Sequence, residues 1–101
     1  MSMRRVIQVN EEVVVEKISR PKCKVSQYYY ANAVDPSILS ISEQTKVSLI
    51  HDKEWHTYTI RALRPGVTSV IFQLRNMIDT KVLEEEVQVF VVLEPGKVNP
   101  Y

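Results

Sequence analysis

The segment HTYTIRALRPGVTSVIFQL, residues His56–Leu74, alternates polar and apolar side chains on both sides of a single Pro-Gly pair. Successive side chains of a strand point to opposite faces, so a period of two indicates a strand with one buried face. Pro65-Gly66 supplies a fixed φ followed by a permissive one, which suits a turn. The segment therefore predicts two strands that meet at this turn, and it carries no catalytic signature.

The alternation also predicts which side chains share the apolar face. These are His56, Tyr58, Ile60 and Ala62 on the first strand and Val70, Phe72 and Leu74 on the second.

Similar segments, rich in Val, Ile, Tyr and Thr and bounded by turn-forming residues, recur along the chain, and helical periodicity is absent. Asp79-Thr80-Lys81 resembles a hairpin loop. This rhythm is typical of a β-sandwich or a β-barrel. We expect about seven or eight strands, near Arg5–Val9, Val13–Ile18, Val25–Asn32, Ile38–Ser42, Val47–His51, Trp55–Leu63, Thr68–Asn76 and Leu83–Leu93.

The length of 101 residues suits one domain, which we expect to span residues 1–96, with residues 97–101 as a C-terminal tail. Hydrophobic residues make up 45% and charged residues 25% of the chain, which is ordinary globular composition and argues against intrinsic disorder. The formal charge is only +1, so binding to nucleic acid or to an anionic membrane would require a local patch.

The first residues lack the apolar core of a signal peptide, and no stretch approaches the ~20 apolar residues of a membrane span. Cys23 is the only cysteine, which excludes an intrachain disulfide and suits a reducing compartment. We therefore expect a cytoplasmic protein, or a domain of a larger protein, without a membrane segment.

A basic segment and an acidic run stand out in this nearly neutral chain. The basic segment, KISRPKCK, carries Lys17, Arg20, Lys22 and Lys24. Together with the neighbouring tyrosines 28–30 it is a candidate for nucleic-acid or anion binding, whereas edge-strand lysines that prevent aggregation are the structural alternative. The acidic run is a solvated strand start that could face the basic segment, within the domain or in a second copy. It consists of Glu84, Glu85 and Glu86.

The stretch HDKEWH, from His51 through Trp55 to His56, is the only cluster with metal-capable chemistry, because two imidazoles could meet across a hairpin and bind zinc with a carboxylate. Its spacing matches no standard metal motif and Lys53 would repel a cation, so we expect a structural turn and no cofactor. Cys23 has cations nearby but no glycines to shape an oxyanion hole. Paired carboxylates, a phosphate-binding loop and a nucleophile elbow are also missing, so we expect no enzyme.

Two segments resemble bacterial immunoglobulin-like group 2 domains. Residues 35–42, DPSILSIS, resemble the "DPSVLSVS"-like strand of that family, and residues 60–70, IRALRPGVTSV, resemble its "A-x-x-P-G-x-T-x-V" hairpin. The alternating strand Val87–Val92 matches the valine strand on which such domains end. The resemblance covers roughly residues 25–93 and implies an immunoglobulin-like sandwich.

The chain also resembles chagasin-type inhibitors of papain-like cysteine proteases, in length, strand rhythm and the "A-x-x-P/A-G-x-T" hairpin. Their inhibitory loops carry an Asn-Pro-Thr-Thr-Gly segment, a glycine-rich loop and an Arg-Pro-Trp segment. This chain has Ser19–Lys24, Leu49–Glu54 and Arg75–Asp79 at the corresponding places, and only Arg75 matches. The resemblance implies kinship of fold, and none of the family's inhibitory residues is carried over.

Together these patterns predict an all-β, immunoglobulin-like antiparallel β-sandwich. We expect a non-enzymatic protein-interaction or structural module that binds another protein or a second copy through loops or a sheet edge. A chagasin-like protease inhibitor is the first alternative, and nucleic-acid or anion binding through residues 17–24 is the second. The candidate contact residues are Lys17, Arg20, Lys22, Lys24, His51, Trp55, His56, Arg75, Glu84, Glu85 and Glu86.

Overall fold

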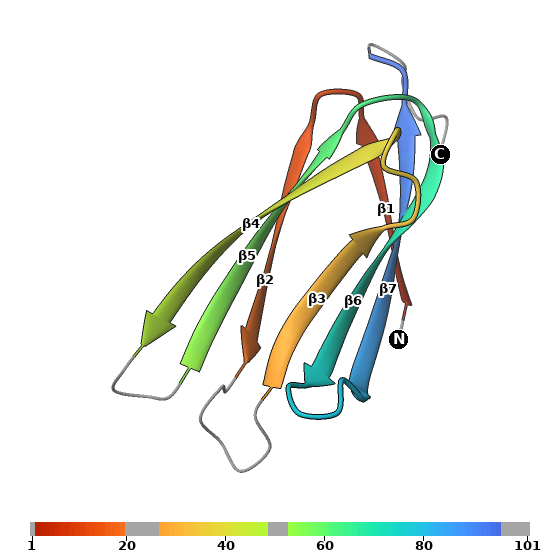
Figure 1. Ribbon diagram of the computed structural model, residues 1–101. Coiled ribbons are helices and arrows are strands. Elements are labelled where there is room, and N and C mark those ends of the chain that lie inside the picture. Colours follow the sequence, from red (N-terminus) through yellow and green to blue (C-terminus); the bar gives the residue numbers. More distant parts are fainter. Residues whose placement is uncertain (1, 20–26, 49–52, 96–101) are drawn as a thin grey trace.

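The computed structural model describes residues 2–19, 27–48 and 53–95, and these residues form an all-β structure. No helix that could cross a membrane occurs among them. The seven strands of the described chain are β1 (Ser2–Gln8), β2 (Glu12–Ser19), β3 (Gln27–Ala33), β4 (Leu39–Ser48), β5 (Lys53–Ala62), β6 (Gly66–Asn76) and β7 (Val82–Leu93) (Figure 1).

The strands form two sheets that pack face to face. One sheet has four strands in the order β1-β7-β6-β3, and the other has three in the order β2-β5-β4. Strand β1 runs parallel to β7, whereas every other pair is antiparallel. This arrangement confirms the predicted immunoglobulin-like β-sandwich (Figure 1).

The prediction that two strands meet at Pro65-Gly66 as a hairpin is wrong. Strand β5 belongs to the three-stranded sheet and β6 to the four-stranded sheet, so the chain crosses from one layer to the other between Ala62 and Gly66. The alternation was correctly assigned, but both apolar faces point into the same core from opposite sides. Local periodicity identifies a buried face and does not identify the strand beside it.

The two strands expected at Ile38–Ser42 and Val47–His51 are one strand, β4, as far as the structure describes them. The polar residues between them, from Glu43 to Lys46, keep their pairing with β5 and are exposed. They lie on an edge strand, where a polar run does not need to be a turn. Residues 49–51 of the second expected strand lie outside the described residues.

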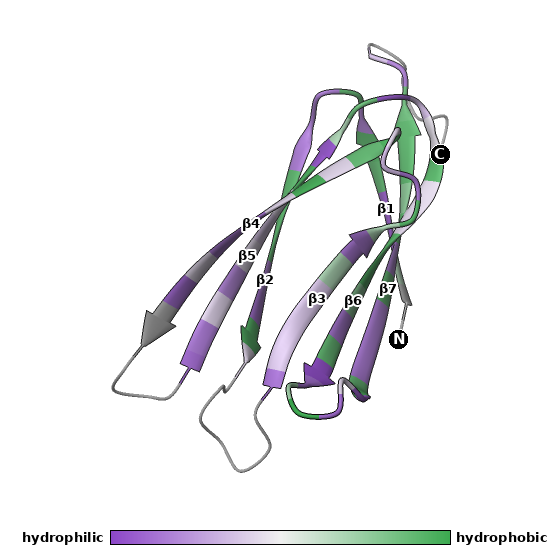
Figure 2. Ribbon diagram, viewed as in Figure 1, coloured by the Kyte–Doolittle hydropathy of each residue, from purple (hydrophilic) through white to green (hydrophobic). Residues whose placement is uncertain are grey.

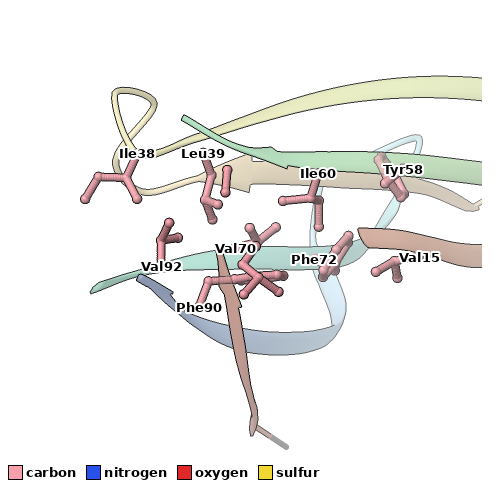
Figure 3. Close-up of a cluster of buried hydrophobic side chains, with 11 residues drawn as sticks. Val15, Ile38, Leu39, Tyr58, Ile60, Val70, Phe72, Phe90 and Val92 are labelled. Carbon is pink, nitrogen blue, oxygen red and sulfur yellow. The ribbon is translucent and has the colours of Figure 1, made fainter. Parts of the chain in front are cut away.

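The apolar core lies between the two sheets (Figure 3). Tyr58 of β5 meets Phe72 of β6 edge to face, with 5.4 Å between the ring centroids. The core is completed by Ile7, Val15, Ile38, Leu39, Ile60, Ala62, Val70, Phe90 and Val92. All seven side chains that the alternation assigned to the apolar face are buried, which confirms that prediction.

Polar side chains replace the apolar ones toward the end of the sandwich where β6 leads into β7 (Figure 2). Ser19 and His56 are buried between the sheets in this half, whereas the aliphatic core residues Ile38, Leu39 and Val92 lie at the opposite end. The interior is therefore graded along the strands.

Gly66 allows the crossing between the sheets to pass close to the core. Its φ is +151°, and a Cβ at this position would lie 2.7 Å from Cδ1 of Ile38. A side chain therefore meets both backbone strain and a buried neighbour.

We predict that Gly66→Ala lowers the free energy of unfolding by about 1–3 kcal/mol, measured by urea denaturation. The neighbouring substitution Val67→Ala is the control, because Val67 is 66% exposed and its truncation should cost less than about 1 kcal/mol. Equal losses for the two variants would contradict this account of Gly66.

Candidate functional site

One end of the sandwich, which we call the loop end, is the candidate site. It gathers the last residues of β2, β4 and β6 and the first residues of β3, β5 and β7 (Figure 1). The strand pairings place Ser19 opposite Glu54 and Gln27 opposite Asn76 at this end. All three segments assigned to inhibitory loop positions start or finish here. The candidate residues Arg20, Lys22, Lys24 and His51, and also Cys23, lie outside the described residues.

The β6–β7 turn, residues 77–81, is held by its own hydrogen bonds. The amide of Asn76 donates to the carbonyl of Lys81 over 2.8 Å, and the amide of Thr80 donates back to the carbonyl of Asn76 over 2.9 Å. The side chains of Asn76 and Asp79 accept from the amides of Ile78 and Lys81. These contacts confirm the predicted hairpin loop and fix its shape.

This turn presents apolar side chains to solvent. Ile78 is 85% exposed, the largest exposed fraction among the large hydrophobic residues that the structure describes, and its neighbour Met77 is 53% exposed. Thr80 has a φ of 58°, a left-handed conformation that is rare for β-branched residues. An exposed apolar tip on a locally fixed, strained turn is typical of a contact site.

His56 lies inside the loop end and is not at the surface, since only 5% of the residue is exposed. Its Nε2 atom lies 2.9 Å from the Oγ of Ser19 on β2, and its Nδ1 atom lies 2.7 Å from a carboxylate oxygen of Glu43 on β4. The connectivity matches a Ser-His-acid triad, but Ser19 is 1% exposed, so no substrate carbonyl reaches its hydroxyl. Within the described residues no group of side chains could hold a metal ion.

Aromatic rings extend this polar cluster into the core. The ring of Tyr29 meets His56 edge to face at 5.8 Å, and the ring of Tyr58 is stacked against it at 6.4 Å. The Tyr58 hydroxyl is buried without a hydrogen-bond partner in the described part of the chain. Burial raises the pKa of the Tyr58 phenol, and the negative charge of Glu43 adds to the effect.

Lys17 and Glu86 form an ion pair across the two sheets. The Lys17 ammonium also lies 5.2 Å from the centre of the Phe72 ring. The two charges border a recess that Tyr29 and Leu74 also line. The basic segment and the acidic run therefore meet within one molecule at these two residues. Self-association through the same blocks of charge stays a prediction.

The remaining candidate residues lie on the outer faces of the sheets or at the rim of the recess. Arg75 packs over the ring of Tyr30, 4.4 Å from its centre, and donates to the side chain of Gln73. Glu85 accepts from the same Gln73 side chain, and Glu84 is exposed beside the recess. Trp55 is half-buried on β5, next to Ile18 of β2. None of the candidate residues that the structure describes forms an exposed apolar tip like that of the β6–β7 turn.

Solved structures with folds similar to this one include the following two. The cysteine protease inhibitor EhICP2 from Entamoeba histolytica matches with a TM-score of 0.68 and 11% identity, over 91% of this chain and 85% of that one. Amebosin matches with a TM-score of 0.62 and 9% identity, over 89% of this chain and 88% of that one. These likenesses show the shared fold.

No family model matches the chain, and no curated protein sequence is similar to it. The resemblance to bacterial immunoglobulin-like group 2 domains therefore gains no support. The fold comparison fits the kinship of fold that the other resemblance, to inhibitors of cysteine proteases, implies.

Sequence reasoning missed the residues that distinguish the loop end. Met77 and Ile78 are two adjacent apolar residues before a predicted turn, a signal that could have marked an exposed tip. The link from Ser19 through His56 to Glu43 joins three strands and leaves no local pattern.

We predict that Thr80→Gly raises the free energy of unfolding by about 1 kcal/mol, because glycine adopts positive φ without strain. Thermal or urea denaturation measures this change. Asn10, with a φ of 73°, is the matched control. Asparagine tolerates this conformation, so Asn10→Gly should shift stability by less than about 0.5 kcal/mol. A Thr80→Gly variant less stable than the parent protein would contradict this interpretation of the turn.

A second prediction concerns the ion pair across the sheets. The hydrogen bond from Lys17 lowers the pKa of Glu86 below its ordinary value of 4.5. A lowered pKa contributes stability above pH 4.5, and this contribution is lost as pH falls through the folded-state value. Lys17→Met should therefore destabilise the protein more at neutral pH than at a pH well below 4.5, in urea denaturation at both conditions.

The control for that measurement is Lys46→Met, which removes an exposed lysine from edge strand β4. Its effect on stability should be small and should not follow the ionisation of Glu86. A loss from Lys17→Met that is the same at both pH values would show that the ion pair does not set the pKa of Glu86.

Proposed function

We propose that the chain is a non-enzymatic inhibitor that binds a papain-like cysteine protease with its loop end. The observation that carries the proposal is the β6–β7 turn, where Ile78 stands 85% exposed on a backbone held by local hydrogen bonds. Exposing a large aliphatic side chain at a fixed turn brings no stability to the free protein. It does favour binding, because little conformational freedom is lost when a partner covers it.

The fold supports the choice of partner class. EhICP2, a cysteine protease inhibitor by description, shares the sandwich over 85% of its own length. Several connections converge on the loop end of this sandwich, as the strand bounds require, and such a set of loops suits the cleft of an enzyme.

The contact itself must differ from that of chagasin-type inhibitors, because the motifs of their three loops are absent here. In place of an Arg-Pro-Trp segment, this chain has Arg75-Asn76-Met77 followed by Ile78. Arg75 is already occupied by Tyr30 and Gln73 on the outer face. We therefore assign the main apolar contact of the turn to Ile78, with Met77 beside it.

The proposal predicts that the protein slows peptide hydrolysis by papain at micromolar concentration. Ile78→Asp should weaken inhibition by at least about thirtyfold, which corresponds to about 2 kcal/mol of binding free energy, because an anchor in a desolvated contact has effects of that size. An inhibition constant determined for each variant by steady-state kinetics measures the change.

Val67→Asp is the matched control. Val67 is an aliphatic residue near the start of β6, at the end of the sandwich away from the turn, and it is 66% exposed. Its substitution should change inhibition by less than about threefold. Absence of inhibition by the parent protein would overturn the proposed function. Equal losses in the two variants would overturn the role of Ile78 alone.

A further inference from the structure

The loop end contains a buried histidine whose two ring nitrogens join different strands. His56 on β5 contacts Ser19 on β2 through Nε2, at 2.9 Å, and Glu43 on β4 through Nδ1, at 2.7 Å. Ser19 and His56 are 1% and 5% exposed. The imidazole therefore ties all three strands of one sheet together directly below the loop end.

The direction of each hydrogen bond follows from the chemistry of the partners. An ionised carboxylate only accepts, so the Nδ1 atom of His56 must carry the hydrogen that faces Glu43. In a neutral ring the other nitrogen is then an acceptor. The hydroxyl of Ser19 therefore donates to Nε2.

Proton uptake would reverse the second bond. When both ring nitrogens carry hydrogen, Nε2 can only donate, and the oxygen of Ser19 must accept. The Ser19 hydroxyl hydrogen then has to turn to another acceptor. The bond to Ser19 becomes charge-assisted, and the bond to Glu43 joins two opposite charges, so both are strengthened. Ser19 is the last residue of β2, so the change falls where that strand enters the loop end.

The charges around the ring decide whether it can bear a proton. The Glu43 carboxylate is in contact, and a Glu54 oxygen lies 3.9 Å from Nε2. From β3 and β5 the rings of Tyr29 and Tyr58 face the imidazole and are neutral at ordinary pH. The nearest cation on β2, Lys17, is paired with Glu86 of β7. The positive ring would therefore face two carboxylates and no unpaired cation within the described residues.

We propose that His56 is a proton-sensitive positioning residue: its protonation reverses the hydrogen bond to Ser19, strengthens the links among β2, β4 and β5, and so tightens partner binding at the loop end in mild acid. The part that concerns binding rests on the proposed function. Histidine is the side chain that proteins most often use as a proton-dependent switch.

The test uses a His51→Gln variant, in which His56 is the only histidine. NMR of the ¹⁵N-labelled protein follows the ring nitrogens and the Ser19 amide from pH 8 to pH 5. We expect the Nδ1–H form at high pH, proton uptake at Nε2, and a shift of the Ser19 amide that follows the same titration. A Ser19 amide that does not respond while the ring titrates would overturn the inference. An Nε2–H form at high pH would overturn it too.

The binding part is tested by inhibition of papain at pH 5.5 and 7.5. At each pH, the inhibition constant of a variant that also carries Ser19→Ala is divided by that of the His51→Gln variant. This ratio should be at least about fivefold larger at pH 5.5 than at pH 7.5. Normalising to the Ser19→Ala variant removes the pH dependence of papain itself and any loss of a merely structural contact. An unchanged ratio would overturn the inference.

The failures of the two proposals are distinguishable. If papain is not inhibited at any pH, the proposed function fails, and the spectra alone decide whether His56 controls Ser19. If papain is inhibited but the ratio to the Ser19→Ala variant does not change with pH, the proposed function stands and His56 has no positioning role in binding.

Discussion

The interleaving of side chains from β5 and β6 across the sandwich is the contact on which the other strands depend. Strand β5 is the central strand of its sheet and pairs with both β2 and β4, and β6 pairs with both β3 and β7. The edge-to-face contact of Tyr58 with Phe72 therefore joins the strands that organise the two layers. Only β1 has no direct pairing with either of them.

The interior changes along the strands from aliphatic side chains, which stabilise the fold, to polar side chains at the loop end. Aliphatic side chains fill the end away from the β6–β7 turn, where burial contributes most to stability. At the loop end the interior contains an ion pair, a hydrogen-bonded histidine and a buried phenol. Such polar groups contribute less than packed hydrophobic residues, but their geometry is specific and responds to charge.

The sequence predicted the fold class and the buried faces, because alternation along a strand is a local property. His56 and Phe72 were assigned to interior faces for this reason, and both lie there. It did not predict the layer to which β5 and β6 belong, because strand partners are chosen by packing between distant segments. Polar residues 43–46 were similarly taken for a break between two strands. An exposed stretch of an edge strand has the same polar composition as a turn.

The composition and charge of the chain gave little guidance to the candidate site. The segments at the three inhibitory loop positions start or finish at one end of the sandwich, as the strand bounds show. The composition of the site was less predictable, because charge was taken as the main signal of contact. Lys17 and Glu86 form an ion pair with each other. The exposed Ile78 lies in a turn whose shape depends on backbone hydrogen bonds.

The parallel pairing of β1 with β7 has a consequence for how the chain is made. The first strand has the last strand as its only partner in the sheet, with Ser2 opposite Val87 and Gln8 opposite Leu93. A ribosome releases β1 before β7 is made, so the four-stranded sheet cannot close until β7 has been synthesised. Until then the unpaired β1 is open to chaperones or to a neighbouring nascent chain. The twelve residues of β7 therefore control when β1 becomes protected.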